Sequence, residues 1–154
     1  MIPVREALAG DIPQLVALMA EFYAEAGYPL PTVAATRTFA DLLGDARLGR
    51  VWLLEAAGAP AGYIVLTISF SMEYGGLRGF VDDLFVRVAY RGQGLATAGL
   101  AEVQRMAEAL GVRALLVEVG PENDTARRVY GRSGFTDTGR RLLARPLAAA
   151  VHEG

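Results

Sequence analysis

Three residue types that carry much enzyme chemistry are absent or nearly absent from this sequence. Its 154 residues include no cysteine and one histidine, and all fifteen basic residues are arginine, so lysine is absent too. These absences exclude disulfides, cysteine nucleophiles, lysine Schiff bases and a P-loop lysine. The one histidine, His152, lies near the C-terminus, where we expect a frayed chain end. We therefore expect neither a histidine triad nor a metal requirement.

The remaining composition is ordinary for a globular protein. Hydrophobic residues make up 53%, charged residues 21%, and the formal net charge is −2 at pH 7, which argues against nucleic-acid binding. The first residues carry charges where a secretory signal would be apolar, and the longest uncharged run, residues 56–72, is interrupted by glycine and proline. We expect a single domain over residues 1–154, cytoplasmic and without a membrane partner.

Hydrophobic periodicity divides the chain into strands and helices. Helices are expected over residues 12–26, 32–43 and 95–110, with a short fourth helix that ends near Gly134. Asp11 and Gln14 have the spacing of a capping box for the first of them. Strands are expected over residues 4–8, 51–56, 62–70, 79–86 and 113–119, with one or two closing strands within 135–147. This order predicts an α/β fold with a mixed sheet and helices packed on it.

The stretch YRGQGLATAGL, residues 90–100, joins a predicted strand to a predicted helix through Gly92 and Gly94. Glycine allows close backbone approach, and the first N–H groups of a helix have no partner within the helix, so such a turn can bind phosphate. A tight turn without a ligand fits a lone Gly-x-Gly equally well. A dinucleotide fingerprint would need glycine where Thr97 stands, which disfavours a nicotinamide enzyme.

Residues 81–100, VDDLFVRVAYRGQGLATAGL, resemble the signature segment of the GNAT superfamily of acetyl-CoA-dependent N-acetyltransferases. The family pattern Arg/Gln-x-x-Gly-x-Gly/Ala falls on Arg91, Gly94 and Ala96. Val88 departs from the proline that relatives often carry before the loop. The next family motif is also similar, on the positions Asn123, Ala126, Tyr130, Gly134 and Phe135. The resemblance covers essentially the whole chain.

The resemblance implies a fold and a cosubstrate. The fold is a mixed, mostly antiparallel sheet, splayed between two parallel strands and flanked by about four helices. The cosubstrate is acetyl-CoA, whose pyrophosphate would bind backbone amides around the glycine turn and whose pantetheine arm would lie along the preceding strand. The implied coenzyme contacts are Leu84, Phe85, Val86, Arg91, Gly92, Gln93, Gly94, Leu95, Ala96, Thr97, Asn123, Ala126 and Tyr130.

For catalysis, the resemblance implies that Tyr130 protonates the departing thiolate and that a carboxylate deprotonates the amine. Asp82 is the first candidate base and Asp83 the second, acting through a water. Strand alternation would direct only one of them to the cleft unless a bulge intervenes. Both could instead cap the strand or pair with Arg78. A backbone N–H near Leu84 would stabilise the oxyanion.

The acceptor is the least determined part of the site. Five residues come from segments that border the acceptor in relatives: Tyr23, Tyr28, Met72, Glu73 and Tyr74. An acidic and aromatic lining suits a cationic primary amine, of a small molecule or a peptide. The same tyrosines also fit ordinary core packing. A catalytically idle acyl-CoA-binding regulatory module is the alternative function, and the choice between monomer and homodimer stays open.

Overall fold

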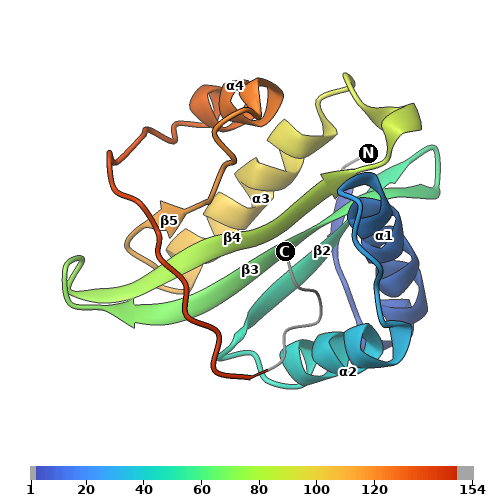
Figure 1. Cartoon of the computed structure of the whole chain (residues 1–154), viewed down its shortest axis with the longest axis horizontal. Coiled ribbons are helices and arrows are strands. Elements are labelled where there is room, and N and C mark those ends of the chain that lie inside the picture. Colours follow the sequence, from blue (N-terminus) through green and yellow to red (C-terminus); the bar gives the residue numbers. More distant parts are fainter. Residues whose placement is uncertain (1–2, 149–154) are drawn as a thin grey trace.

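A five-stranded sheet runs through the centre of the structure, a computed structural model that describes residues 3–148 (Figure 1). The strands lie in chain order: β1 (Val4–Glu6), β2 (Gly49–Ala56), β3 (Ala59–Ser71), β4 (Gly76–Val86) and β5 (Leu115–Leu116). The first four pair antiparallel, whereas β4 and β5 are parallel. The predicted mixed, mostly antiparallel sheet is confirmed. His152 lies outside the described residues.

Helices cover both faces of the sheet (Figure 1). They are α1 (Ile12–Glu25), α2 (Thr32–Leu43), α3 (Leu95–Ala109) and α4 (Asp124–Arg132), with short 3-10 helices η1 (Ala9–Asp11) and η2 (Val88–Tyr90). On β2, Val51 and Leu53 face α1 and α2, while Trp52 and Leu54 face α3. All four side chains are buried, because alternate residues of a central strand enter the two halves of the core.

Strands β4 and β5 pair over only two residues and then diverge. The pairs are Gly79 with Leu115 and Phe80 with Leu116. Of the predicted strand 113–119, only Leu115 and Leu116 pair with β4 as strand residues. The chain after Leu116 moves away from β4 and has no neighbouring strand. The predicted splay between two parallel strands is confirmed, and the predicted length of the second strand was wrong.

The closing strands predicted within 135–147 were also wrong. Residues 136–148 are exposed and form no helix or strand. The two-residue β5 offers too little edge for another strand to pair with. Leu142, Leu143 and Leu147, which suggested strands, have exposed fractions of 66%, 92% and 91%. Their apolar character therefore does not reflect burial within this chain.

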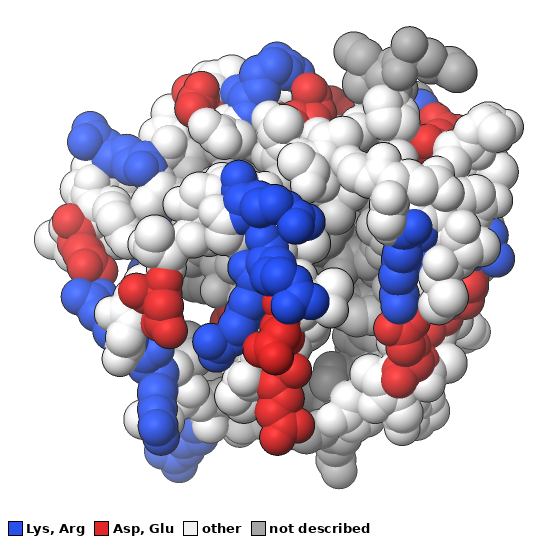
Figure 2. Space-filling model, turned by 90° about the horizontal axis from the view of Figure 1, so that it is seen from above, with Lys and Arg blue, Asp and Glu red and all other residues white. Residues whose placement is uncertain are grey.

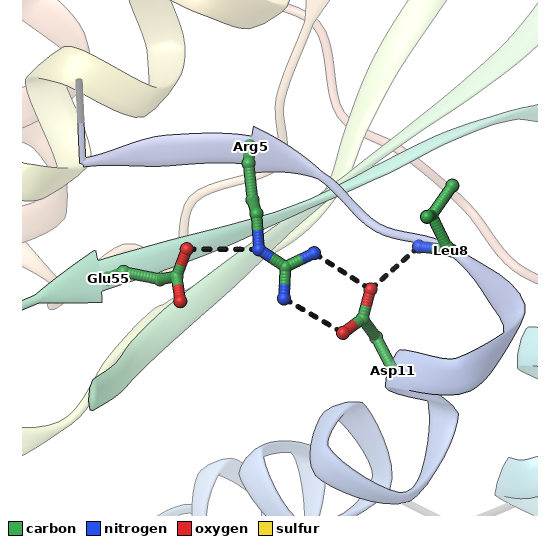
Figure 3. Close-up of polar contacts among 4 residues, drawn as sticks. All are labelled: Arg5, Leu8, Asp11 and Glu55. Atoms are coloured by element: carbon green, nitrogen blue, oxygen red, sulfur yellow. Dashed lines mark hydrogen bonds and ion pairs between the residues drawn. The ribbon is translucent and has the colours of Figure 1, made fainter. Parts of the chain in front are cut away.

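Asp11 occupies the position predicted for the cap of α1, but its carboxylate makes other bonds (Figure 3). It accepts from the Leu8 N–H at 2.8 Å and from both terminal nitrogens of Arg5 at 2.9 Å. The predicted capping box with Gln14 was wrong, because the bidentate arginine draws the carboxylate away from the helix start. Arg5 also bonds Glu55 at 3.0 Å and so ties β1 to β2.

At Gly62, strand β3 leaves no room for a side chain against β4. A Cβ atom there would lie 2.1 Å from the Phe85 carbonyl oxygen and 3.1 Å from the Val86 Cα, and neither backbone atom can move freely. We expect Gly62→Ala to lower the free energy of unfolding by about 1–3 kcal/mol, measured by urea denaturation. Gly131→Ala, in open space on α4, is the matched control and should be neutral or stabilising by up to about 1 kcal/mol. Equal stabilities for the two variants would contradict this close contact.

Candidate active site

The glycine turn adopts a backbone conformation that other residues rarely reach. Gly92 and Gly94 have φ of +78° and +80°, and Gly94 is the N-cap of α3 without any side-chain cap. The N–H groups of the first helical turn, Leu95 to Thr97, consequently have no acceptor within the helix. The Leu95 side chain is buried in the core, so this residue offers only its backbone to the turn. The turn thus has the unpaired donors and helix polarity that favour an anion.

Arg91 fixes the turn to the rest of the molecule. Its Nε donates to the Val86 carbonyl oxygen at 2.8 Å, and a terminal nitrogen contacts both oxygens of Glu25 at 2.7 and 2.9 Å. Arg87 contacts Glu21, one turn earlier on α1, at 3.1 Å. Two carboxylates on one face of α1 therefore hold two arginines that flank η2. The guanidinium of Arg91 already bonds the Val86 carbonyl and the Glu25 carboxylate. The backbone N–H groups are therefore the part of the turn that can bind an anion.

A β-bulge in β4 decides where the two aspartates point. Val65 pairs with Asp83 and Leu66 with Val81, so Asp82 is the extra residue. Asp83 consequently lies opposite Val65, on the face covered by α1 and α2, while Val81 belongs to the opposite core. Arg78, the partner suggested from the sequence, instead donates to Ser69 at 3.3 Å.

Beyond its two-residue pairing with β5, strand β4 has no strand partner on that edge in the described part of the chain. The Arg87 N–H donates to the Ala61 carbonyl on β3, so alternation directs the backbone groups of Phe85 to β3 and those of Leu84 and Val86 to the opposite edge. That edge is the one from which β5 has diverged. Leu84 is therefore placed to offer its backbone groups to a ligand in the gap.

Asp83 is the more strongly perturbed carboxylate. Burial raises its pKa to about 6; a hydrogen bond from Tyr63 opposes this and the charge of Asp82 adds to it. The Tyr63 hydroxyl donates to Asp83 Oδ2 at 2.9 Å. Asp82 is more exposed, and burial raises its pKa as well. Sequence reasoning missed Tyr63; the available signal was a tyrosine within an otherwise aliphatic buried run.

Tyr130, on α4, lies within the electrostatic reach of Asp83. Burial first, and the charge of Asp83 second, raise its pKa to about 12. Its ring packs edge-on against Phe135, with centroids 5.6 Å apart, in the core on the α3 side. Asp83 belongs to the α1 side, so the two groups influence each other across the gap between β4 and β5. Asn123 is the N-cap of α4 and accepts from the Ala126 N–H at 3.0 Å.

The residues predicted to contact the acceptor separate into two groups. Tyr23 lies close to the aspartates, because burial and the charges of Asp83 and Asp82 raise its pKa. Tyr28 follows it, donating its N–H to the Tyr23 carbonyl oxygen at 2.8 Å. Met72, Glu73 and Tyr74 are instead at the β3–β4 hairpin, where Glu73 contacts Arg140 at 2.8 Å. At about 3.3 Å per residue, the start of β4 is roughly 20 Å from Asp82.

Charges elsewhere on the molecule are interleaved. On the face drawn in Figure 2, basic side chains gather at the centre with carboxylates directly beside them, and basic and acidic side chains touch again nearer the edges. Within residues 3–148, no three metal-binding side chains cluster as a metal ion would require. In the same part of the chain, no helix combines the length and apolarity needed to span a bilayer.

Comparison with known proteins agrees with this geometry. A profile of the acetyltransferase (GNAT) family matches residues 14–135. A crystal structure of an integron cassette protein from the mobile metagenome of Cole Harbour Salt Marsh is 54% identical, with a TM-score of 0.91 over 98% of this chain and 94% of that one. An aminoglycoside N-acetyltransferase in complex with CoA is 20% identical, with a TM-score of 0.81 over 94% of each chain.

A curated relative matches over a shorter length. The uncharacterised N-acetyltransferase YycN of Bacillus subtilis (strain 168) is 37% identical over 59 residues, a match that spans 38% of each chain. The class of protein defined by the splayed sheet and the glycine turn is an acyltransferase that uses coenzyme A. The chain belongs to the acetyltransferase (GNAT) family, and the predicted enzyme class, an acetyl-CoA-dependent N-acetyltransferase, is confirmed.

The raised pKa of Asp83 links stability to pH. In the unfolded chain an aspartate ionises near pH 3.8, whereas in the folded protein it ionises near pH 6. Below pH 3.8 the carboxyl group of Asp83 is protonated in both the folded and the unfolded protein, so its ionisation does not affect stability. As the pH rises toward 6, the free energy of unfolding falls by up to about 3 kcal/mol.

We expect Asp83→Asn to be more stable than the parent at pH 8 and equal to it below pH 4, measured by urea denaturation. Asp41→Asn, on the exposed face of α2, is the control for removal of an aspartate from the surface. A gain that persisted unchanged to low pH would contradict the assignment.

Proposed function

We propose that this protein, acting as one domain over residues 1–154, transfers the acetyl group of acetyl-CoA directly to a primary amine in a ternary complex. Two observations support the proposal: Tyr63 donates a hydrogen bond to the carboxylate of Asp83, and the charge of Asp83 acts on the Tyr130 hydroxyl. A half-buried carboxylate whose pKa is raised to about 6 suits a general base near neutral pH. An idle acyl-CoA-binding module would have no need for such a base beside a phenol.

The residues around the gap fit acetyl-CoA, which supplies the acetyl thioester. The turn from Arg91 to Thr97 would hold the pyrophosphate through backbone N–H groups at the start of α3. Leu84 and Val86 direct backbone groups to the free edge of β4, although the Val86 carbonyl already accepts from Arg91. An amide-bearing pantetheine arm would satisfy the backbone groups that β5 leaves unpaired. Asn123 and Ala126, at the start of α4, would complete the coenzyme contacts.

Burial and hydrogen bonding favour Asp83 over Asp82 as the base, the reverse of the order expected from sequence. Asp83 would accept a proton from the ammonium of the acceptor, and the free amine would attack the acetyl carbonyl. The backbone N–H of Leu84 would donate to the developing oxyanion. Asp82, more exposed at the bulge, would add negative charge at the mouth of the site.

Tyr130 would donate its proton to the departing sulfur as the carbon–sulfur bond breaks. The acceptor nitrogen loses two protons overall: one passes through Asp83 to solvent, and the second replaces the proton that Tyr130 gave to sulfur. The charge of ionised Asp83 contributes to the raised pKa of Tyr130. Once Asp83 has taken a proton this charge is gone, so Tyr130 becomes a stronger acid at the stage when the thiolate needs one.

For the acceptor, the residues nearest the base support a cationic amine. Asp82 and Asp83 would attract an ammonium, and Tyr23 adds an aromatic ring beside them. Glu73 contributes little to this attraction, since it lies at the hairpin and is already paired with Arg140. A screen of small amines and peptide N-termini, with free CoA release as the readout, tests the acceptor class. Release that requires an amine would distinguish the enzyme from the idle module.

We expect Gly94→Val to remove most of the stabilisation that acetyl-CoA gives the parent, about 2.7 kcal/mol at one hundred times its dissociation constant. A branched side chain at φ +80° strains the turn and would occupy the space of the phosphate. Gly94→Asn separates the two causes, because asparagine tolerates this conformation. It should fold like the parent and still bind acetyl-CoA weakly in calorimetry. Parental affinity in both variants would show that this turn is not the coenzyme site.

We expect Tyr130→Phe to lower turnover by about 100-fold or more, because it removes one general acid. The ring and its contact with Phe135 are kept, so the melting temperature and the affinity for acetyl-CoA should change little. Tyr74→Phe, at the distant hairpin, is the matched control. If Tyr130→Phe keeps more than about half of the parental turnover where chemistry limits the rate, the thiolate does not depend on this hydroxyl.

A further inference from the structure

Tyr63 places a hydroxyl group in the middle of the core. It lies on β3, in the cluster between the sheet and helices α1 and α2, and its exposed fraction is 0%. A buried phenol needs a hydrogen-bond partner, and the partner of Tyr63 is Asp83 Oδ2, 2.9 Å away on the neighbouring strand. Tyr63 lies opposite Phe85 and Asp83 opposite Val65, so the bond runs diagonally across the β3–β4 pair, on the face covered by α1 and α2.

Aromatic neighbours fix the ring of Tyr63. Phe39, on α2, packs edge-on against it with centroids 6.1 Å apart, and Phe85 lies at 6.4 Å. Phe85 is in turn stacked on Phe22 of α1 at 5.3 Å. The ring of Tyr63 is thus packed against α2 and β4, and α1 supports it indirectly through Phe85. Its hydroxyl can therefore fix the carboxylate that it contacts.

We propose that Tyr63 is a positioning residue for catalysis: its hydroxyl holds one oxygen of Asp83 and leaves the other oxygen to take the proton of the acceptor amine. This inference rests on the proposed function, in which Asp83 is the base. The titratable groups that face Asp83 come from four elements: Tyr63 of β3, Asp82 of β4, Tyr23 of α1 and Tyr130 of α4. Among the contributions to the pKa of Asp83, burial and Asp82 raise it and Tyr63 lowers it.

A hydrogen bond to the charged form of a carboxylic acid lowers its pKa, so loss of that bond raises it. In Tyr63→Phe the titration midpoint of Asp83 should therefore move to higher pH than the parental value of about 6. The midpoint can be followed by NMR of the aspartate carboxyl carbons in labelled protein, with Asp83→Asn to assign the signal. This measurement requires neither an acceptor nor turnover.

The matched control is Val51→Ala, which loosens the same core without removing a hydrogen-bonding group. It should lower the melting temperature and leave the midpoint of Asp83 in place. A fluorinated tyrosine at position 63 gives an independent measurement, because its hydroxyl is the stronger donor and should move the midpoint to lower pH. This replacement keeps the hydroxyl and its hydrogen bond to Asp83, and so avoids any loss of folding caused by Tyr63→Phe.

Activity provides the second readout. With the best amine from the acceptor screen, Tyr63→Phe should lower kcat by about 3- to 10-fold, shift the acidic limb of the pH–rate profile upward, and leave the KM for acetyl-CoA unchanged. An unmoved midpoint in an active enzyme would overturn the positioning role alone. If the midpoint moves in Tyr63→Phe but the parent protein acetylates none of the amines, this role is overturned together with the proposed function.

Discussion

The unequal pairing of strand β4 is the constraint on which the site depends. One edge of β4 is paired with β3 along the whole strand, whereas the other edge meets β5 at only two residues. The divergence leaves backbone groups on that edge of β4 without a strand partner beyond Phe80. We refer to this place in the sheet as the passage between its two faces. Asp83 approaches this passage from the α1 side and Tyr130 from the α4 side. Neither a long loop nor a second chain is needed to bring the two groups together.

The bulge at Asp82 determines the position of Asp83 and lowers the stability of the fold. It places Asp83 beneath α1, where ionisation at neutral pH opposes folding by up to about 3 kcal/mol. A protein of this size is stable by about 5–15 kcal/mol in total, so the cost is a substantial fraction. The aromatic cluster of Phe22, Phe39, Tyr63 and Phe85 offsets it by apolar burial on the same face.

The sequence predicts most of the fold because its local signals are strong. The second helix matches its predicted bounds, and the glycine turn was assigned to a strand–helix junction through residue types alone. The bulge was raised as a possibility but could not be located, because residues 81–86 do not alternate between apolar and polar side chains. The hydrogen bond between Tyr63 and Asp83 depends on that bulge, so it could not be predicted from the sequence either. The closing strands failed because exposed leucines resemble the apolar residues of a strand.

The ion pairs around the glycine turn also bear on the choice between arginine and lysine at these positions. Arg87 and Arg91 link η2 and the turn to Glu21 and Glu25 of α1, and every basic side chain of the sequence other than its histidine is likewise a guanidinium. A guanidinium stays protonated and has no amine nitrogen free to attack a thioester. Lysine at either position could form a similar pair, but it would hold a primary amine beside a bound acetyl donor. The arginines thus form the ion pairs that hold the turn without offering a side chain of their own to acetylate.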